Sequence, residues 1–195
     1  RAAQRRGYKV YQLAGNTTLD RWGQPRAAGG VAMLIDNRLS CCNPLYKLGS
    51  CSQTLGIWVE DWFVCTFYAP PDRSNRRDNA QTEVAEQITE ILHESQAQRW
   101  LFCGDANEIP GDSTIAAALV AQGGTTLQIN RGTRWQSDRE IDWFNCNDHS
   151  LCLQPQCVEL HVSDHVPLCL QIPVRDVNLQ IQALQMGPNW AKPAG

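Results

Sequence analysis

Short apolar runs separated by turn residues dominate the chain, and this pattern predicts many strands and few helices. Glu60 and Asp61 separate two such runs and predict a hairpin. The segments 16–28 and 37–52 are rich in turn-forming residues and are predicted as loops. The predicted strands are 8–13, 31–36, 55–59, 62–68, 100–103, 125–129, 141–145, 151–153 and 166–172.

Two stretches have helical periodicity. In the first, over 78–95, apolar residues recur on one face of a helix at Val84, Ile88 and Ile91. The second covers 113–121, with Asp112 as its expected N-cap and two glycines as its end. Strands grouped between helices favour an α+β fold in which sheets pack inside and helices outside. We expect one domain over 1–172 and a glutamine-rich tail over 173–195.

Composition is that of an ordinary globular domain. The chain has 195 residues, of which 43% are hydrophobic and 19% charged, and this excludes a disordered chain. No apolar run approaches the ~18 residues of a membrane helix. The nine cysteines follow no regular spacing, and no signal segment is visible. We therefore expect reduced thiols and an intracellular location, nuclear or cytoplasmic.

The net charge of −3 conceals a basic amino-terminal segment and two groups of arginines. Such clusters are either solvated surface or a patch that binds phosphate backbone, and their sequence alone leaves both interpretations open. The basic residues are Arg1, Arg5, Arg6, Lys9, Arg21 and Arg26, then Arg73, Arg76 and Arg77, and finally Arg131, Arg134 and Arg139.

Two strand ends carry polar residues that core packing does not explain. Tyr68 ends an apolar strand directly before two prolines, so its hydroxyl is expected at the rim of the sheet. Asp105 ends another strand, and Asn107 follows two residues later. A tyrosine with a solvated hydroxyl and an Asx-turn would be the simpler explanations.

Two later strands show the same feature. Asp142 lies between Ile141 and Trp143 in an apolar run, where a carboxylate is costly to bury without a partner, although an exposed edge strand would also accept it. Asp164 and His165 stand directly before the last apolar strand. An Asp–His pair is a common means of fixing an imidazole's tautomer and raising its basicity.

In this order, T-F-Y-A-P, G-D-A-N, R-E-I-D-W and S-D-H-V-P resemble the strand-end motifs of the endonuclease/exonuclease/phosphatase superfamily. The strand that begins at Gly29 resembles the one preceding them, so the resemblance spans residues 29–172. It is greatest to the endonuclease domains of non-LTR retroelements. The resemblance implies a four-layered α/β sandwich, two mainly antiparallel sheets flanked by helices, and metal-dependent hydrolysis of phosphate esters, with DNA as the favoured partner.

The resemblance also implies roles for the residues that match the motifs. Asp105 would orient and deprotonate the attacking water, Asn107 would position phosphate or metal, and Tyr68 would hydrogen-bond a phosphate oxygen. Asp142 would brace His165, which would stabilise the charge that develops on phosphorus.

The metal implied is Mg²⁺ or Mn²⁺, since carboxylates suit hard cations. Asp164 and Asp105 would hold it. The superfamily also uses an asparagine and a Gln-Glu pair from its first two strands, and residues 1–28 match neither. The resemblance therefore implies that the amino-terminal part lies outside this sequence, and we expect weak metal binding and poor cleavage.

Three alternatives stay open. The chain could be an inactive remnant that binds phosphate or nucleic acid, or a phosphatase acting on sugar or lipid phosphates. A structural zinc site is the third, because two Cys/His pairs have tolerable ligand spacing. These residues are Cys146, His149, Cys157 and His161.

Overall fold

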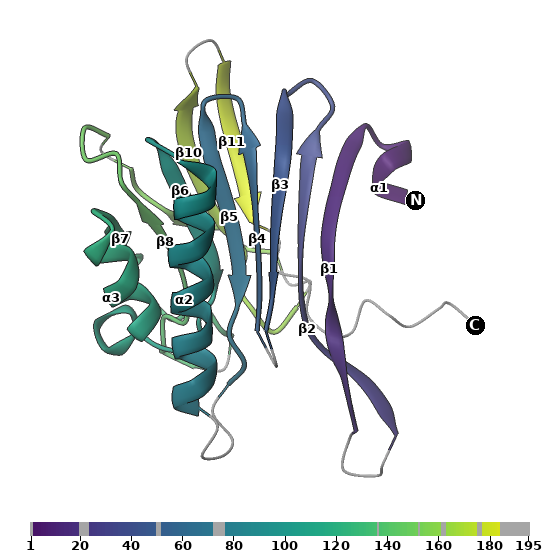
Figure 1. The fold of residues 1–195 in the computed structure, drawn as a ribbon, viewed down its shortest axis with the longest axis vertical. Helices are drawn as coiled ribbons and strands as arrows, with labels where there is room; N and C mark the ends of the chain where they lie inside the picture. Colours follow the sequence, from purple (N-terminus) through teal and green to yellow (C-terminus); the bar gives the residue numbers. More distant parts are fainter. Residues whose placement is uncertain are drawn as a thin grey trace.

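The structure is a computed structural model that describes most of the chain. The described residues are 2–19, 24–49, 52–71, 77–135, 137–151, 153–160, 163–174 and 177–183. The predicted α/β sandwich is confirmed: two layers of strands pack face to face, and two helices cover one of them (Figure 1).

A six-stranded sheet forms the centre of the molecule. Its strands alternate in direction except where β5 and β6 run parallel, and there the chain crosses through a helix, as parallel neighbours require. The predicted hairpin at residues 60–61 is confirmed as the turn between β4 and β5. In order across the sheet, the strands are β3 (Cys41–Leu48), β4 (Gln53–Val59), β5 (Trp62–Tyr68), β6 (Trp100–Asp105), β8 (Asp142–Cys146) and β7 (Thr125–Leu127).

Both predicted helices are present and lie on one face of this sheet. Helix α2 (Arg77–Ser95) and helix α3 (Thr114–Ala121) bury their apolar sides against β5, β6 and β8. The expected N-cap of α3, Asp112, is wrong by one residue. Ser113 is the cap, and its hydroxyl accepts the backbone N–H of Ala116. Asp112 instead ends the short 3₁₀ helix η1 (Pro110–Asp112).

The other face of the sheet is covered by strands. A long hairpin of β1 (Tyr8–Leu19) and β2 (Pro25–Asp36) covers one part, and the antiparallel set β9 (Gln156–Cys157), β10 (Leu168–Val174) and β11 (Val177–Ala183) covers another. Inward side chains of β2 and β10 complete a core between the two layers. Representative members are Val31, Met33, Leu168, Leu170 and Ile172.

Several elements differ from the sequence prediction. The segment predicted as a loop over 16–28 contains the paired ends of β1, up to Leu19, and β2, from Pro25, and the loop predicted over 37–52 contains β3. No strand forms at the described residues of 151–153, and the short β9 follows instead. Strand pairing continues to Ala183, past the expected boundary at 172. The missed parts of β1 and β2 are N-T-T-L and P-R-A-A-G-G, and β3 is interrupted by Asn43 and Pro44, so neither region shows a regular strand pattern.

The described part of the chain has one further helix, α1 (Ala2–Arg5), beside β1. None of the described helices combines the length and the apolar character needed to cross a membrane.

The register of the six-stranded sheet places four polar residues in one row at the rim of its inner face. Gln53 pairs with Tyr68, Tyr68 with Asp105, and Asp105 with Asp142. Residues paired across neighbouring strands project from the same face. The sheet itself therefore brings together residues that lie far apart in the sequence.

Truncation of Leu170 tests the packing of β10 on the six-stranded sheet. Its side chain is fully buried between the layers, so Leu170→Ala should lower the free energy of unfolding by about 2–5 kcal/mol. Urea denaturation measures this loss. As a control, Val120→Ala removes methyl groups from an exposed position on α3 and should change stability by no more than about 0.5 kcal/mol. Equal losses in both variants would contradict the packing described.

Candidate active site

Asp105 ends β6 at the rim of the sheet and is largely buried. Its Oδ1 accepts the backbone N–H of Asn107 at 3.0 Å, which fixes one carboxylate oxygen in an Asx-turn. The other oxygen, Oδ2, lies 3.9 Å from Nε2 of His165. The predicted Asx-turn and the predicted site role therefore apply to different oxygens of the same side chain.

Asn107 adopts a left-handed backbone conformation, with φ of +53°, which asparagine tolerates better than most residues. Its Nδ2 donates to the carbonyl oxygen of Ala69 at 2.8 Å. The turn after β6 is thus tied to the end of β5, and the guanidinium of Arg139 approaches the Asn107 carbonyl oxygen at 3.5 Å. These contacts hold the strand ends of Asp105 and Tyr68 together.

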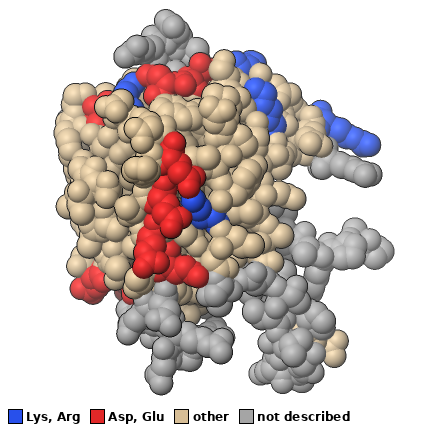
Figure 2. Space-filling model, viewed as in Figure 1, with Lys and Arg blue, Asp and Glu red and all other residues tan. Residues whose placement is uncertain are grey.

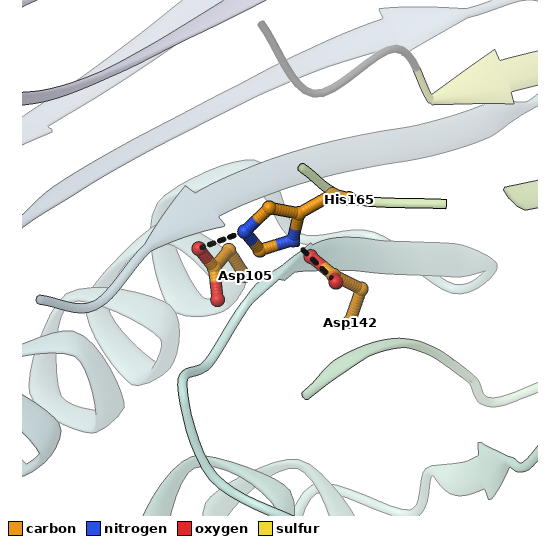
Figure 3. Close-up of side chains that lie close together, drawn as sticks. All are labelled: Asp105, Asp142 and His165. Atoms are coloured by element: carbon orange, nitrogen blue, oxygen red, sulfur yellow. Dashed lines mark hydrogen bonds and ion pairs between the residues drawn. The ribbon is translucent and has the colours of Figure 1, made fainter. Parts of the chain in front are cut away.

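His165 lies between two carboxylates (Figure 3). Its Nδ1 is 2.7 Å from Oδ2 of Asp142, and its Nε2 faces Asp105. Asp142 comes from the six-stranded sheet, whereas His165 precedes β10 in the opposite layer. The predicted contact between Asp142 and His165 is therefore present, and it joins the two layers at the rim.

Two hydroxyl groups that the sequence did not single out for this purpose hold the pair in place. The hydroxyl oxygen of Thr133, fully buried, accepts the backbone N–H groups of Ile141 and Asp142, both at 3.0 Å. The hydroxyl of Ser163 accepts the N–H of His165 at 2.9 Å and donates to its carbonyl oxygen. Thr133 lies in T-R-W and Ser163 opens S-D-H, but lone hydroxyl residues in irregular segments carry no pattern that predicts such contacts.

The two carboxylates govern the charge of the imidazole. Burial alone would lower the pKa of His165, but the hydrogen bond to Asp142 and the negative charges of Asp142, Asp105 and Asp164 outweigh it and raise the pKa from 6.5 to about 9. His165 is therefore an imidazolium at neutral pH. Because the folded-state pKa exceeds the unfolded value, the stability that His165 contributes is complete below 6.5 and is lost as the pH rises through about 9.

The pKa of Asp105 is also raised, but here burial is the main cause. Burial and the nearby charge of Asp142 raise the pKa of its carboxyl to about 7, while His165, the Asn107 amide and Arg134 act in the other direction. A carboxyl with a pKa near neutrality can both accept and release a proton under ordinary conditions. This property is what a water-activating base requires.

The structure separates Asp164 from this cluster. Its carboxylate is half exposed and forms an ion pair with Arg134 at 3.0 Å. The expected metal pair of Asp164 and Asp105 is therefore not assembled here, because Asp164 points to the guanidinium at the surface. Tyr68 is placed as expected beside Asp105 in the sheet, with its ring against Gly29.

Among the described residues, one group of side chains could hold a metal ion. It consists of Asp105, Asp142 and His165, whose ligand atoms all lie within 4.8 Å of one another. The Oδ1 atom of Asp142 is buried and has no hydrogen-bond partner in the described part of the chain, so a cation could use it as a ligand. Two carboxylates and a neutral imidazole would fit Mn²⁺, whereas in the imidazolium form of His165 only the carboxylate oxygens can coordinate, and these fit Mg²⁺.

The zinc alternative gains no support. The two ring nitrogens of His149 are already engaged, Nδ1 with the hydroxyl of Thr125 and Nε2 with the carbonyl oxygen of Gly123. Cys146 is buried in β8. His161 lies outside the described residues, and no Cys/His group capable of holding metal is found among the others.

The third arginine group lies next to the site. Arg134 pairs with Asp164 and Arg139 approaches Asn107, while Arg131 is exposed nearby in sequence. Arg73 and Arg76 lie outside the described residues.

No protein-family model matches the chain, and a search of curated proteins finds no significant match. Solved structures do match. The chain has the endonuclease/exonuclease/phosphatase fold. An endonuclease/exonuclease/phosphatase family protein from Bacteroides thetaiotaomicron superposes with a TM-score of 0.58 at 12% identity, covering 84% of this chain and 74% of that one. The sequence-based prediction of this fold is thereby confirmed.

Two further structures with the endonuclease/exonuclease/phosphatase fold are similar. The 3′ phosphatase NExo from Neisseria, bound to product DNA hairpin, gives a TM-score of 0.59 at 15% identity and covers 86% of this chain and 80% of its own. The endonuclease domain of TRAS1, a telomere-specific non-LTR retrotransposon, gives 0.55 at 19% identity and covers 85% and 79%. At these identities the likeness establishes the fold alone.

The charge of His165 can be measured directly. We expect its imidazole to titrate near pH 9 in the metal-free protein, followed by ¹H–¹⁵N NMR of the ring nitrogens. In Asp142→Asn, which removes the charge of the partner carboxylate, the pKa should fall toward 6.5. An unchanged pKa in that variant would contradict the geometry described, and His149 in the same spectra provides an internal reference.

Proposed function

We propose that this chain is a divalent-metal-dependent phosphodiester hydrolase that acts on DNA. The observation that carries the proposal is the position of His165 between Asp142 and Asp105, with its Nδ1 bound and its Nε2 facing the second carboxylate. An imidazolium held in this way offers a fixed positive N–H donor at a site rim. Such a donor stabilises the negative charge that develops on phosphate oxygens during hydrolysis.

Asp105 is the candidate base. Its pKa near 7 allows it to take a proton from water at neutral pH, and its Oδ1 is held by the Asn107 amide, so that Oδ2 alone is available. His165 lies close enough to orient the same phosphate that the water attacks. Asp142 acts through His165, since it fixes the ring and its proton on Nδ1.

A divalent cation held by Asp105 and Asp142 would neutralise charge on the phosphate. Both carboxylates are already engaged with the imidazole: Oδ2 of Asp142 hydrogen-bonds its Nδ1, and Oδ2 of Asp105 faces its Nε2 at 3.9 Å. The positive imidazolium also repels a cation. We therefore propose that metal binding by this chain is weak.

Charge distribution supports a nucleic-acid substrate approaching at the strand ends. Figure 2 shows acidic side chains in a band over α2, and its exposed members include Glu86, Glu90 and Glu94. Phosphates are repelled from that face. Arginines 131, 134 and 139 instead lie in the segment that leads to Asp142 and could contact the DNA backbone.

The two DNA-related structures of the same fold, the NExo complex and the TRAS1 endonuclease domain, support DNA as the substrate, and the second supports an endonuclease of retroelement type. Seven free cysteines in the described part of the chain suit the reducing nucleus or cytoplasm where such an enzyme would act. An inactive remnant that only binds phosphate is the competing proposal, and activity separates the two.

Replacement of His165 tests the proposed activity. With Mn²⁺ or Mg²⁺ present and EDTA as the blank, the chain should nick supercoiled DNA slowly, and His165→Gln should reduce the rate by about 100-fold or more. As a matched control, His149→Gln removes a histidine bonded to Thr125 and Gly123, away from the cluster, and should leave the rate unchanged. Nicking by His165→Gln at the normal rate would contradict the proposal, and no nicking by any form would favour the inactive remnant.

Calorimetry tests the proposed weakness of the metal site. Mg²⁺ should bind with a Kd weaker than about 0.1 mM, because both carboxylates of the cluster are already paired with the imidazole of His165. Asp105→Asn should abolish the binding signal, whereas Asp164→Asn, which alters an exposed ion pair with Arg134, should change it little. Micromolar binding by the unaltered chain would contradict this description of the site.

A further inference from the structure

Gln53 is the one member of the polar row at the rim to which the motifs assign no role. It begins β4 and pairs with Tyr68, which in turn pairs with Asp105. Its side chain is on the same face of the sheet as Leu55, Ile57 and the site residues, because side chains alternate along a strand. Gln53 is completely buried, and Asp105 and Asp142 of the same row are nearly so.

The carboxamide of Gln53 reaches across to the opposite layer. Its Oε1 accepts the backbone N–H of Gly30 in β2 at 3.0 Å. Because this N–H must face an oxygen, the contact also fixes which end of the amide is Nε2. This hydrogen bond links the rim of the six-stranded sheet to Gly29 and Gly30, the glycine pair of β2.

That glycine pair packs directly on Tyr68. A Cβ atom placed on Gly29 would lie 2.7 Å from Cε1 of Tyr68 and 2.9 Å from Oε1 of Gln53. Gly29 and Gly30 also have φ values of +71° and +108°, where side chains are disfavoured. The backbone of β2 therefore approaches the ring and the carboxamide more closely than any other residue type would allow.

The other half of the carboxamide is unsatisfied. Nε2 of Gln53 is buried and has no hydrogen-bond partner in the part of the chain that the structure describes. A buried donor without a partner is destabilising, and an apolar residue would fill the same space without that cost. An unsatisfied donor at the edge of a site indicates that the acceptor of the same carboxamide, Oε1 of Gln53, is required for function.

We propose that Gln53 is a positioning residue of the active site, which ties Gly30 to the sheet and so holds the Tyr68 ring in place between β2 and the polar row. Gln53 does not touch the substrate. It acts through Tyr68, whose hydroxyl is expected to bond a phosphate oxygen. The activity part of this inference rests on the proposed function, whereas its structural part does not.

NMR tests the structural part without any activity. In Gln53→Leu, the Gly30 amide should exchange with solvent about 10-fold faster, and the Tyr68 ring should flip fast enough to merge signals that are separate in the unaltered protein. Gln53→Glu retains an oxygen acceptor and should restore protection of Gly30. Gln87→Leu is the matched control, since Gln87 of α2 is also a buried glutamine and bonds Thr54 and Ser52 on the face of the sheet that the helices cover. That control should lower thermal stability and leave Tyr68 and Gly30 unchanged.

Kinetics test the coupling to Tyr68. Single-turnover nicking should fall about 10-fold in Gln53→Leu and in Tyr68→Phe, with the DNA concentration at half-saturation unchanged, while the melting temperature of Gln53→Leu stays within a few degrees. The double variant should be no slower than the slower single variant. Multiplicative losses, or an unaltered Tyr68 ring in Gln53→Leu, would overturn the inference. If the unaltered chain does not nick DNA, the proposed function fails, and the NMR result alone decides the role of Gln53.

Discussion

The hydrogen bond between Asp142 and His165 is the interaction on which the rest of the site depends. It connects the polar row at the rim of the six-stranded sheet with the segment before β10. The sheet and β10 belong to opposite layers of the sandwich. A 2.7 Å contact tolerates little sliding of one layer over the other. The core between the layers, which includes Leu170 and Ile172 of β10, therefore also sets the geometry of the candidate site.

This arrangement buries charges that must balance one another. Two carboxylates placed side by side in the sheet would repel each other, and the imidazolium between them offsets that repulsion. Neutral groups supply the other hydrogen bonds. The Thr133 hydroxyl accepts the backbone N–H of Asp142, and the backbone amide of Asn107 donates to the Asp105 carboxylate, and neither adds charge. The attraction between the two groups raises the pKa of His165 and acts against the burial and the Asp142 charge that raise the pKa of Asp105.

The sequence predicted the parts of the site that stand at the ends of regular strands. Asp105, Asn107, Asp142 and His165 follow or precede apolar runs, and the register of a sheet converts that pattern into proximity. Asp164 shows the limit of this reasoning: it is adjacent to His165 in sequence, but its side chain turns outward to Arg134.

Elements without an apolar pattern could not be found in the same way. The polar strand β3 and the glycine-containing hairpin of β1 and β2 are stabilised by pairing and by packing on the core, and neither contribution is visible in local sequence. Gln53 was missed for a related reason. A glutamine at the start of a strand is expected at the surface, and only the backbone of β2 lying above it explains why it is buried.

The most direct test of the central claim is the energetic coupling between Asp142 and His165 in single-turnover DNA cleavage. Asp142→Asn and His165→Gln are compared singly and together, at saturating DNA and a fixed Mn²⁺ concentration. If Asp142 acts only through His165, the double variant will cleave at about the rate of His165→Gln alone. If the two losses multiply, the pair does not work as one unit, and the account of this site is wrong.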